Sequence, residues 1–209
     1  MNIFVLDEDP IVAAKMYCDI HLPKMVVELY QQLGSSVIRH GATPDMMPLT
    51  KKGTPLKGGY HNHPCSRWVG DSRTNFLWAA HHGAALSEEY TKRFGKEHYC
   101  ANGIEILYGL SYLIPEGDLT PFALAMPDEF RPNHLPEIRP TFNPKYGQGK
   151  GKMMYRSEVK GDSHASGDDA VQAYRRYYHA KAFAKWEKGR PMPEWFEPSI
   201  QQYLQQVSE

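Results

Sequence analysis

The fold is decided by residues 19–39, which read DIHLPKMVVELYQQLGSSVIR. Apolar side chains recur there every three or four residues, at Leu22, Met25, Val26, Leu29, Leu33 and Val37. This period places them on one face of an α-helix, and Pro23 is tolerated because the first turn leaves its nitrogen without a helical partner. The stretch therefore predicts a long helix that buries one face in a core.

The flanking sequence predicts a mainly helical protein. A short apolar run at residues 3–6 is consistent with one strand, and Asp9-Pro10 then has the N-cap and first-turn proline that begin a helix. Further helices are predicted at residues 10–17, 71–94, 104–114, 166–188 and 199–207. Gly95 is placed to end the 71–94 helix as a C-cap glycine. Residues 41–60 have no periodicity and are predicted to form a loop.

Residues 115–165 form the longest stretch without a clear pattern. They hold many prolines, glycines and charged side chains. Stretches of this length without periodicity usually carry function or disorder. We therefore predict a compact, mainly α, single domain covering residues 1–209, with an insertion or long loop at 115–165.

Composition excludes several classes of protein. The 209 residues are 41% hydrophobic, which suffices for one substantial core, and 24 basic side chains balance 24 acidic ones. No global charge therefore draws the chain to nucleic acid or to an anionic membrane. Three widely spaced cysteines argue against a disulfide framework. Since neither a signal peptide nor an apolar run of about 18 residues is found, we expect a cytoplasmic protein (in the host cytoplasm if viral) without a membrane partner.

Residues 61–68, HNHPCSRW, are the first candidate for a site. They lead without a break into the 71–94 helix, and polar and aromatic groups gathered at a helix start often contact a ligand. His61, His63 and Cys65, completed by His98 and Cys100, are potential zinc ligands. Their spacing is not the paired C-x2-C pattern of zinc sites, so no metal and no cofactor is predicted.

A second candidate lies on the 166–188 helix. Tyr174, Tyr178, Lys181 and Lys185 recur along one face, with Arg175 beside them. Cations interleaved with aromatic rings suit a nucleic-acid backbone, since the cations neutralise phosphate while the rings stack. The alternative is a half-buried stripe whose lysines reach outward to solvent. The basic residues of the insertion have two similar interpretations, a flexible segment that binds phosphate or a loop whose charges simply face solvent. These residues are Lys145, Lys150, Lys152, Arg156 and Lys160.

Two smaller motifs have structural and functional interpretations. Cys18 and His21 are residue types that activate each other as nucleophile and base, although a buried structural cysteine is commoner. The acidic run at residues 7–9 either holds a metal or, more simply, caps the first helix.

Three motifs resemble those of one known family. His21-Leu22-Pro23-Lys24 resembles the Glu-Leu-Pro-Arg motif of the phage pyrimidine-dimer DNA glycosylase and lyase, endonuclease V. Residues 63–95 are similar to its central helix, and residues 174–182, YRRYYHAKA, are similar to its C-terminal Tyr-Lys-Tyr-Tyr-Gly-Lys-Ala run. Together they cover roughly a third of the chain, in the same order. The resemblance implies a compact helical protein that bends duplex DNA and works at a pyrimidine.

The chain departs from that family at both catalytic positions. The family's nucleophile is the amine exposed when the initiator methionine is removed, whereas the bulk of Asn2 normally leaves Met1 in place. His21 stands where the resemblance places the catalytic glutamate, and it lacks the standing negative charge that would stabilise a cationic sugar. A histidine base suits instead a phage-type transferase that modifies thymine in duplex DNA, where it would deprotonate an incoming amine or water.

We therefore predict a DNA base-modifying transferase with His21 as general base. Lys24, His63 and Arg67 complete the predicted catalytic group, with Lys24 and Arg67 holding a departing phosphate. The predicted DNA-binding residues are Arg73, Tyr174, Arg175, Tyr178 and Lys181. Double-stranded DNA and a small amine or amino-acid donor are the expected partners. The alternatives are a pyrimidine-specific glycosylase and AP lyase, and a phage protein that binds DNA without catalysis.

Overall fold

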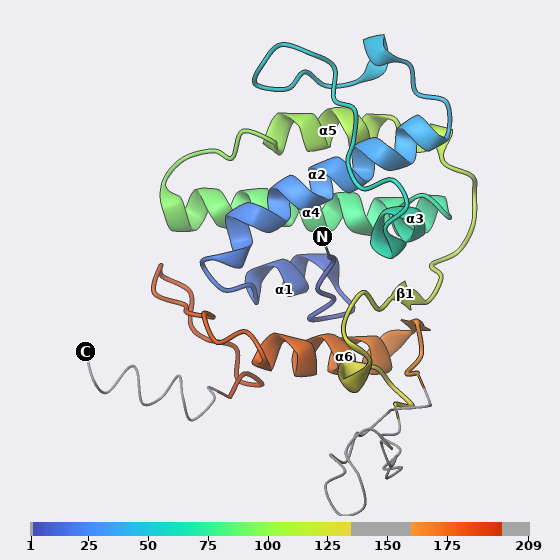
Figure 1. Ribbon diagram of the computed structural model, residues 1–209. Coiled ribbons are helices and arrows are strands. Elements are labelled where there is room, and N and C mark those ends of the chain that lie inside the picture. Colours follow the sequence, from blue (N-terminus) through green and yellow to red (C-terminus); the bar gives the residue numbers. More distant parts are fainter. Residues whose placement is uncertain (1, 135–159, 198–209) are drawn as a thin grey trace, which may run out of the picture.

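The computed structural model describes residues 2–134 and 160–197 (Figure 1). Within these residues the protein is mainly helical, with one two-stranded sheet. The α-helices are α1 (Pro10–Lys15), α2 (His21–Arg39), α3 (Pro64–Val69), α4 (Arg73–Phe94), α5 (Ala101–Gly109) and α6 (Gly167–His179). Short 3-10 turns lie at η1 (Pro44–Met46), η2 (Ser111–Leu113) and η3 (Asp128–Phe130). The predicted helix at 199–207 lies outside the described residues.

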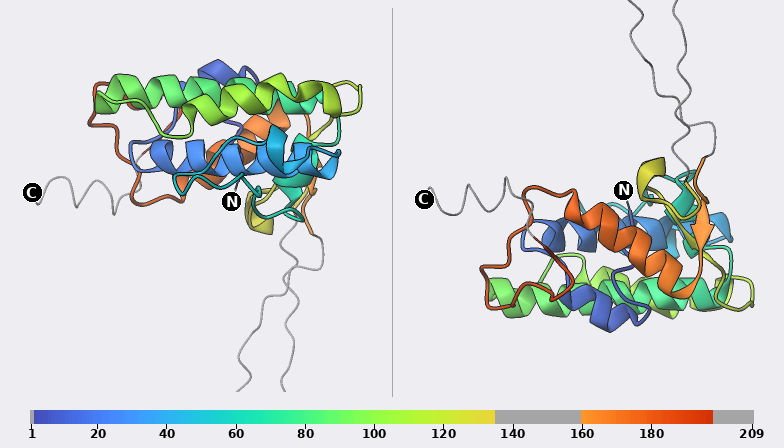
Figure 2. Two further views of the ribbon diagram at one scale, coloured as in Figure 1. Left: turned by 90° about the horizontal axis from the view of Figure 1, so that it is seen from above. Right: turned by 90° about the horizontal axis from the view of Figure 1, so that it is seen from below.

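The helices form two layers. Figure 2 shows α1, α4 and α5 in one layer and α2 and α6 in the other. Helix α4 packs against α1, α2 and α5, so it is the centre of the core. One face of α4 is apolar and buried, with Phe76 and Leu86 at 0% exposure, while His81, Glu88 and Lys92 on the opposite face are exposed.

The boundaries of the helices confirm several of the local signals. Asp9 caps α1, because its carboxylate accepts hydrogen bonds from the backbone N–H groups of Ile11 and Val12. Helix α2 carries Pro23 in its first turn, and Gly95 ends α4 with a positive φ of 68°. The acidic run at residues 7–9 thus contains the cap of the first helix.

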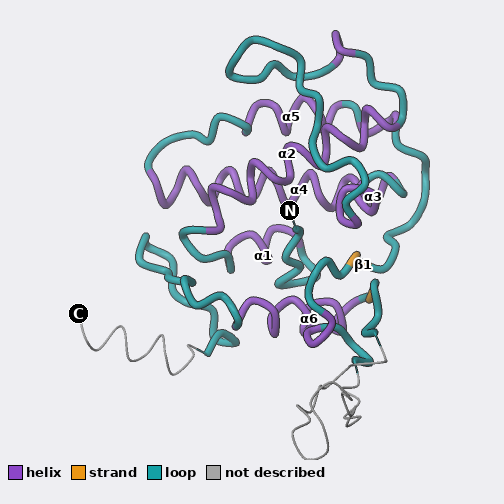
Figure 3. Tube along the Cα trace, in the orientation of Figure 1, coloured by secondary structure: helices purple, strands orange, loops and turns teal. Residues whose placement is uncertain are grey.

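Three predictions about elements were wrong. Residues 3–6 are buried but form no strand, and the Leu6 N–H donates to the Phe4 carbonyl at 2.9 Å in a tight turn. Residues 61–68 do not continue into the long helix, because Gly70 ends α3 and Ser72 begins α4 as a new N-cap. Helix α6 ends at His179 and not near residue 188, and the chain continues as loop (Figure 3).

The predicted insertion is partly built into the core. Strands β1 (Phe122–Ala123) and β2 (His164–Ala165) pair antiparallel and so close the two ends of the 115–165 segment. Phe122, Leu124 and Met126 are buried. Residues 135–159, which include Lys145, Lys150, Lys152 and Arg156, lie outside the described part of the chain. In the part that is described, no helix is both long and apolar enough to cross a lipid bilayer.

Candidate functional site

Asn2 joins segments from both layers of the fold. Its backbone N–H donates a 2.9 Å hydrogen bond to Oε2 of Glu28, and its carbonyl accepts one from Gln32 of α2. Its side chain accepts from the Tyr174 hydroxyl of α6 at 3.0 Å and donates to the carbonyl of Ala125 at 2.8 Å. These four contacts fix the start of the described chain between α2 and α6 (Figure 1).

Glu28 is the carboxylate at the centre of the candidate site. It is buried at 8% exposure on α2, and the amide of Asn2 holds one of its oxygens. The other oxygen lies 3.5 Å from Nζ of Lys24, one turn earlier and 65% exposed. The carboxylate is therefore fixed on its inner side and bordered by an exposed cation on its outer side.

His63 lies close enough to Glu28 for the carboxylate to influence its titration. Partial burial lowers the pKa of His63, while the charge of Glu28 acts in the opposite direction. Nδ1 of His63 accepts the backbone N–H of Cys65 at 3.2 Å and so caps α3. In the neutral ring this contact leaves the proton on Nε2, so His63 is suited to donate a hydrogen bond and not to remove a proton.

His21 lies in a more buried place than His63. Its ring stacks on Phe4 at 5.1 Å, and Nδ1 lies 3.1 Å from the Tyr178 hydroxyl, which also accepts the backbone N–H of Cys18. Either partner can donate in the contact between His21 and Tyr178, according to the tautomer of the ring. Burial, with Lys181 and Lys24 nearby, lowers the pKa of His21 to about 4. A ring with so low a pKa, engaged at Nδ1 by Tyr178, binds a proton weakly and is a weak general base.

Stability should depend on pH in the acidic range because of two of the buried histidines, His21 and His82, whose pKa burial lowers to about 4. Their unfolded pKa is about 6.5, so between pH 6.5 and pH 4 the unfolded chain binds protons that the folded chain does not. The free energy of unfolding should fall through this window as pH falls, by about 2 kcal/mol per histidine at pH 5. Urea unfolding from pH 8 to pH 4.5 measures it.

Adjacent histidines supply the control for this prediction. His82→Asn should remove about 2 kcal/mol of the fall at pH 5, whereas His81→Gln on the exposed face should leave the slope as in the wild type. An unchanged slope in His82→Asn would show that His82 is not held neutral by the fold.

The late tyrosines belong to the core. Tyr174 and Tyr178 are 0% exposed, so neither ring offers a surface to DNA. The alternative of a half-buried stripe holds only for the packing of the tyrosines, because Lys181 and Lys185 lie beyond the end of the helix. Burial raises the pKa of both phenols well above its usual value. Lys181 lies beyond the end of α6, with Nζ 3.7 Å from the centre of the Tyr177 ring. It is partly buried and, like Tyr178, lies near His21.

Of the three predicted arginines, two hold the fold together. Arg175 donates to the carbonyl of Leu6 at 3.0 Å. Arg73 donates to the carbonyl of Ile114 and pairs with Glu116 at 2.8 Å, which fastens the start of α4 to the segment after η2. By contrast, Arg67 is exposed on α3, and its guanidinium has no ion pair among residues 2–134 and 160–197. Arg67 is thus available to an anionic ligand.

Comparisons with known proteins do not identify the function of these residues. No family model, curated protein or solved structure matches the chain. The chemistry proposed below depends only on five residues of this chain: Asn2, Lys24, Glu28, His63 and Arg67.

The cysteines and histidines do not form a metal site in the described residues. No group of three His, Cys, Asp or Glu side chains there is arranged to hold a metal ion. Cys18, Cys65 and Cys100 are all buried and free. Burial raises the pKa of Cys65 and Cys100 to about 11, so neither thiol is activated.

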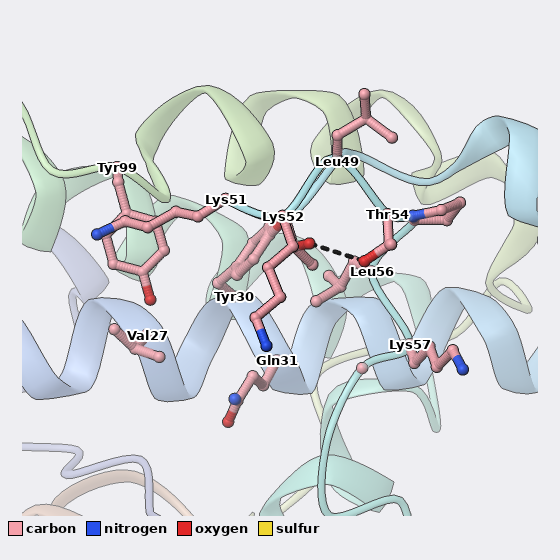
Figure 4. A pocket seen from close by; sticks show the side chains of 13 residues that line it. Val27, Tyr30, Gln31, Leu49, Lys51, Lys52, Thr54, Leu56, Lys57 and Tyr99 are labelled. Atoms are coloured by element: carbon pink, nitrogen blue, oxygen red, sulfur yellow. Dashed lines mark hydrogen bonds between the residues drawn. The ribbon is translucent and has the colours of Figure 1, made fainter.

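A pocket of about 580 Å3 borders the same helix (Figure 4). Val27 and Gln31 of α2 form one wall, and the loop of residues 49–58 forms the other. On a helix, Val27 and Gln31 share a face with Lys24, because these positions are three and four residues apart. The pocket and the Lys24–Glu28 pair thus lie along neighbouring faces of α2.

Sequence reasoning missed Asn2 and Glu28. The signal for Glu28 was present, since it is the one charged residue in the run MVVELY at 25–30. A charge inside an apolar helical stripe must be paired or must serve a site. Asn2 gave no comparable signal, because its role depends on contacts with residues 28, 125 and 174.

Proposed function

We propose that this chain is a DNA-binding enzyme that acts on a pyrimidine base in duplex DNA, as a phage-type base-modifying transferase. The observation that carries the proposal is the Glu28 carboxylate, which is buried, held by the Asn2 amide and bordered by Lys24. A fixed carboxylate at the edge of the core is a suitable proton acceptor. In this proposal Glu28 takes the role of general base that the sequence assigned to His21.

The proposed reaction replaces a leaving group on the pyrimidine with an amine. The amine nitrogen forms a bond to the substituent carbon as the carbon–oxygen bond to a phosphate breaks. Glu28 takes the proton that the amine loses, and Lys24 and Arg67 neutralise the departing phosphate. His63, with its proton on Nε2, donates a hydrogen bond to the substrate. The donor is a small amine or amino acid, and no cofactor is required.

The resemblance to the pyrimidine-dimer glycosylases supports the choice of substrate. The motifs at 21–24 and 174–182 fall on the start of α2 and at the end of α6, and Tyr178 brings these two places together through its bond to His21. A fold similar to that of the glycosylases, turned to a different reaction at a pyrimidine, accounts for both the motifs and the departures from them.

DNA affinity should depend on two exposed basic side chains, Lys24 beside Glu28 and Arg67 on α3. Lys24→Ala and Arg67→Ala should each weaken binding to duplex DNA and should each lower the slope of log affinity against log salt by about 1, as expected for one phosphate contact. Fluorescence anisotropy with a labelled duplex over a salt series measures both quantities. Lys92→Ala, an exposed change on α4, is the matched control. Equal slopes in all three variants and in the wild type would remove this surface from the DNA interface.

The reaction is tested with a duplex that carries thymine phosphorylated on a 5-hydroxymethyl group. Protein, duplex and an amine, either glycine or a diamine, are incubated, and the digested nucleosides are weighed by mass spectrometry. The proposal expects a nucleoside in which the amine has replaced the phosphate. Binding without a new nucleoside for any amine would contradict the transferase and favour a DNA-binding protein without catalysis.

The same geometry favours a second candidate, a pyrimidine-specific glycosylase and AP lyase. In the family that the motifs resemble, the nucleophile is an amine exposed at the chain start. Here the backbone nitrogen of Asn2 lies 2.9 Å from the Glu28 carboxylate, and removal of Met1 would convert this amide nitrogen into such an amine. Incubation of a duplex that carries a pyrimidine dimer with protein and borohydride, read by intact mass, tests this candidate. A covalent protein–DNA adduct supports the lyase, and its absence together with amine transfer supports the transferase.

A further inference from the structure

The pocket beside α2 has an unbalanced positive charge. Three lysines line it, Lys51, Lys52 and Lys57, and none of the lining residues is acidic. All three lysines are exposed, and none forms an ion pair within the described residues. Like charges on one short loop repel each other, so an anion bound among them would relieve the repulsion.

Two tyrosines add aromatic surface without adding charge. Nζ of Lys51 lies 4.0 Å from the centre of the Tyr99 ring, a cation–π contact that holds the ammonium over the pocket (Figure 4). Burial raises the pKa of Tyr99 and of Tyr30 to about 12, so both phenols are neutral near pH 7. Lys52 extends from the same loop across the pocket toward Gln31 of α2 (Figure 4).

The loop that carries the lysines is held in place by its own hydrogen bonds. The Thr50 N–H donates to the carbonyl of Thr54 at 2.8 Å, and the two hydroxyls lie 2.9 Å apart. Gly53 adopts a positive φ of 70° at the tip of the turn. The loop is thus shaped before any ligand arrives, which lowers the entropic cost of binding.

The far end of the loop is fastened directly to α2. The Ser35 hydroxyl donates to the Gly59 carbonyl and accepts the Gly59 N–H, both at 2.8 Å. Gly58 has a positive φ of 68°, and a Cβ at this position would come within 2.5 Å of Oγ of Ser35. Only glycine therefore allows the loop to approach the helix this closely.

We infer that this pocket binds phosphate groups, of a free nucleotide or of a DNA strand. Ammonium groups without carboxylate partners provide the charge that phosphate oxygens require. A volume of about 580 Å3 is sufficient for a small phosphorylated ligand. Tyr99 and Leu49, both largely exposed, offer apolar surface for the rest of such a ligand. The inference is independent of the proposed function, because neither Glu28 nor His63 lines the pocket.

Calorimetric titration with inorganic pyrophosphate and thymidine diphosphate tests the inference, together with anisotropy on a labelled DNA duplex. The variant Lys51→Ala/Lys52→Ala is compared with Lys92→Ala/Lys96→Ala, which removes two exposed charges from α4 and the segment after it. Pocket binding predicts that the first variant weakens at least one of the three interactions about tenfold or more, while the second changes each by less than about twofold.

The pattern of loss distinguishes the two sources of phosphate. Weaker pyrophosphate and thymidine diphosphate binding, with DNA affinity as in the control, assigns the pocket to a free nucleotide. Weaker DNA binding without binding of the free compounds assigns it to the DNA backbone. Equal losses in the two lysine variants, or no loss in either, would overturn the inference.

Gly58→Ala tests the shape of the pocket while all its charges remain. The added methyl group must displace the loop from Ser35, so the variant should weaken the same interaction as the lysine variant. A thermal melt within a few degrees of the wild type verifies that the variant is folded. Binding at full strength in folded Gly58→Ala would show that the lysines act only as surface charge, and this too would overturn the inference.

Discussion

Glu28→Gln should lower the rate of amine transfer to the pyrimidine by at least about 100-fold. The amide keeps the shape of the side chain and can still accept the Asn2 N–H, but it cannot take a proton from the amine. Affinity for duplex DNA should change little, because Lys24 and Arg67 remain. Nucleoside mass spectrometry gives the rate, and anisotropy gives the affinity.

Glu105→Gln is the control for this variant, since Glu105 is exposed on α5. His21→Gln separates the two possible bases, because it removes the ring from the site while leaving Glu28 intact. If His21→Gln abolished turnover and Glu28→Gln did not, the general base would be His21, as the sequence predicted, and the proposed role of Glu28 would be wrong.

Glu89→Gln should lower the free energy of unfolding by about 3–5 kcal/mol, the usual cost of removing one partner from a buried ion pair. The Glu89 carboxylate accepts from Arg93 at 2.8 Å and from two nitrogens of Arg190 at 2.8 and 2.7 Å. Burial alone would raise the pKa of Glu89, but the hydrogen bonds from Arg190 and Arg93 outweigh it and lower the pKa. The side chains of Glu89 and Arg93 are each 2% exposed, so water cannot hydrate the guanidinium of Arg93 once the carboxylate charge is removed.

The preceding residue is a matched control. Glu88→Gln is exposed on the same helix and should change the free energy of unfolding by less than about 0.5 kcal/mol. Chemical denaturation of both variants measures the difference. Similar values for the two would mean that the cluster around Arg93 contributes no net stability.

The helices could be predicted because their signals are local. In α2 and α4 the apolar period, the proline in a first turn and the C-cap glycine all lie within the element that they define. The break between α3 and α4 was not predicted. It depends on a single hydrogen bond, in which the Ser72 hydroxyl accepts the Asn75 N–H and caps α4. The end of α6 was missed for a similar reason, since Lys181 and Lys185 continue the spacing but lie in loop.

The candidate site was harder to predict because its members are far apart in the sequence. Lys24 and His63 were identified from their motifs, but the carboxylate near them was not, because its position depends on the amide of Asn2. The motif around His21 predicts a catalytic role for the ring but does not reveal its burial or its contact with Tyr178, 157 residues away. Residue type gave the candidates, whereas long-range hydrogen bonds determine which can exchange a proton.

The place of residues 2–6 between α2 and α6 has a consequence for how the chain reaches this fold. Phe4 packs against Tyr174, Tyr177 and Tyr178, so its burial requires a helix that a ribosome makes more than 160 residues later. Contacts between such distant residues form slowly, because a long loop must close first. During synthesis Phe4 therefore remains without these three ring partners until α6 has emerged.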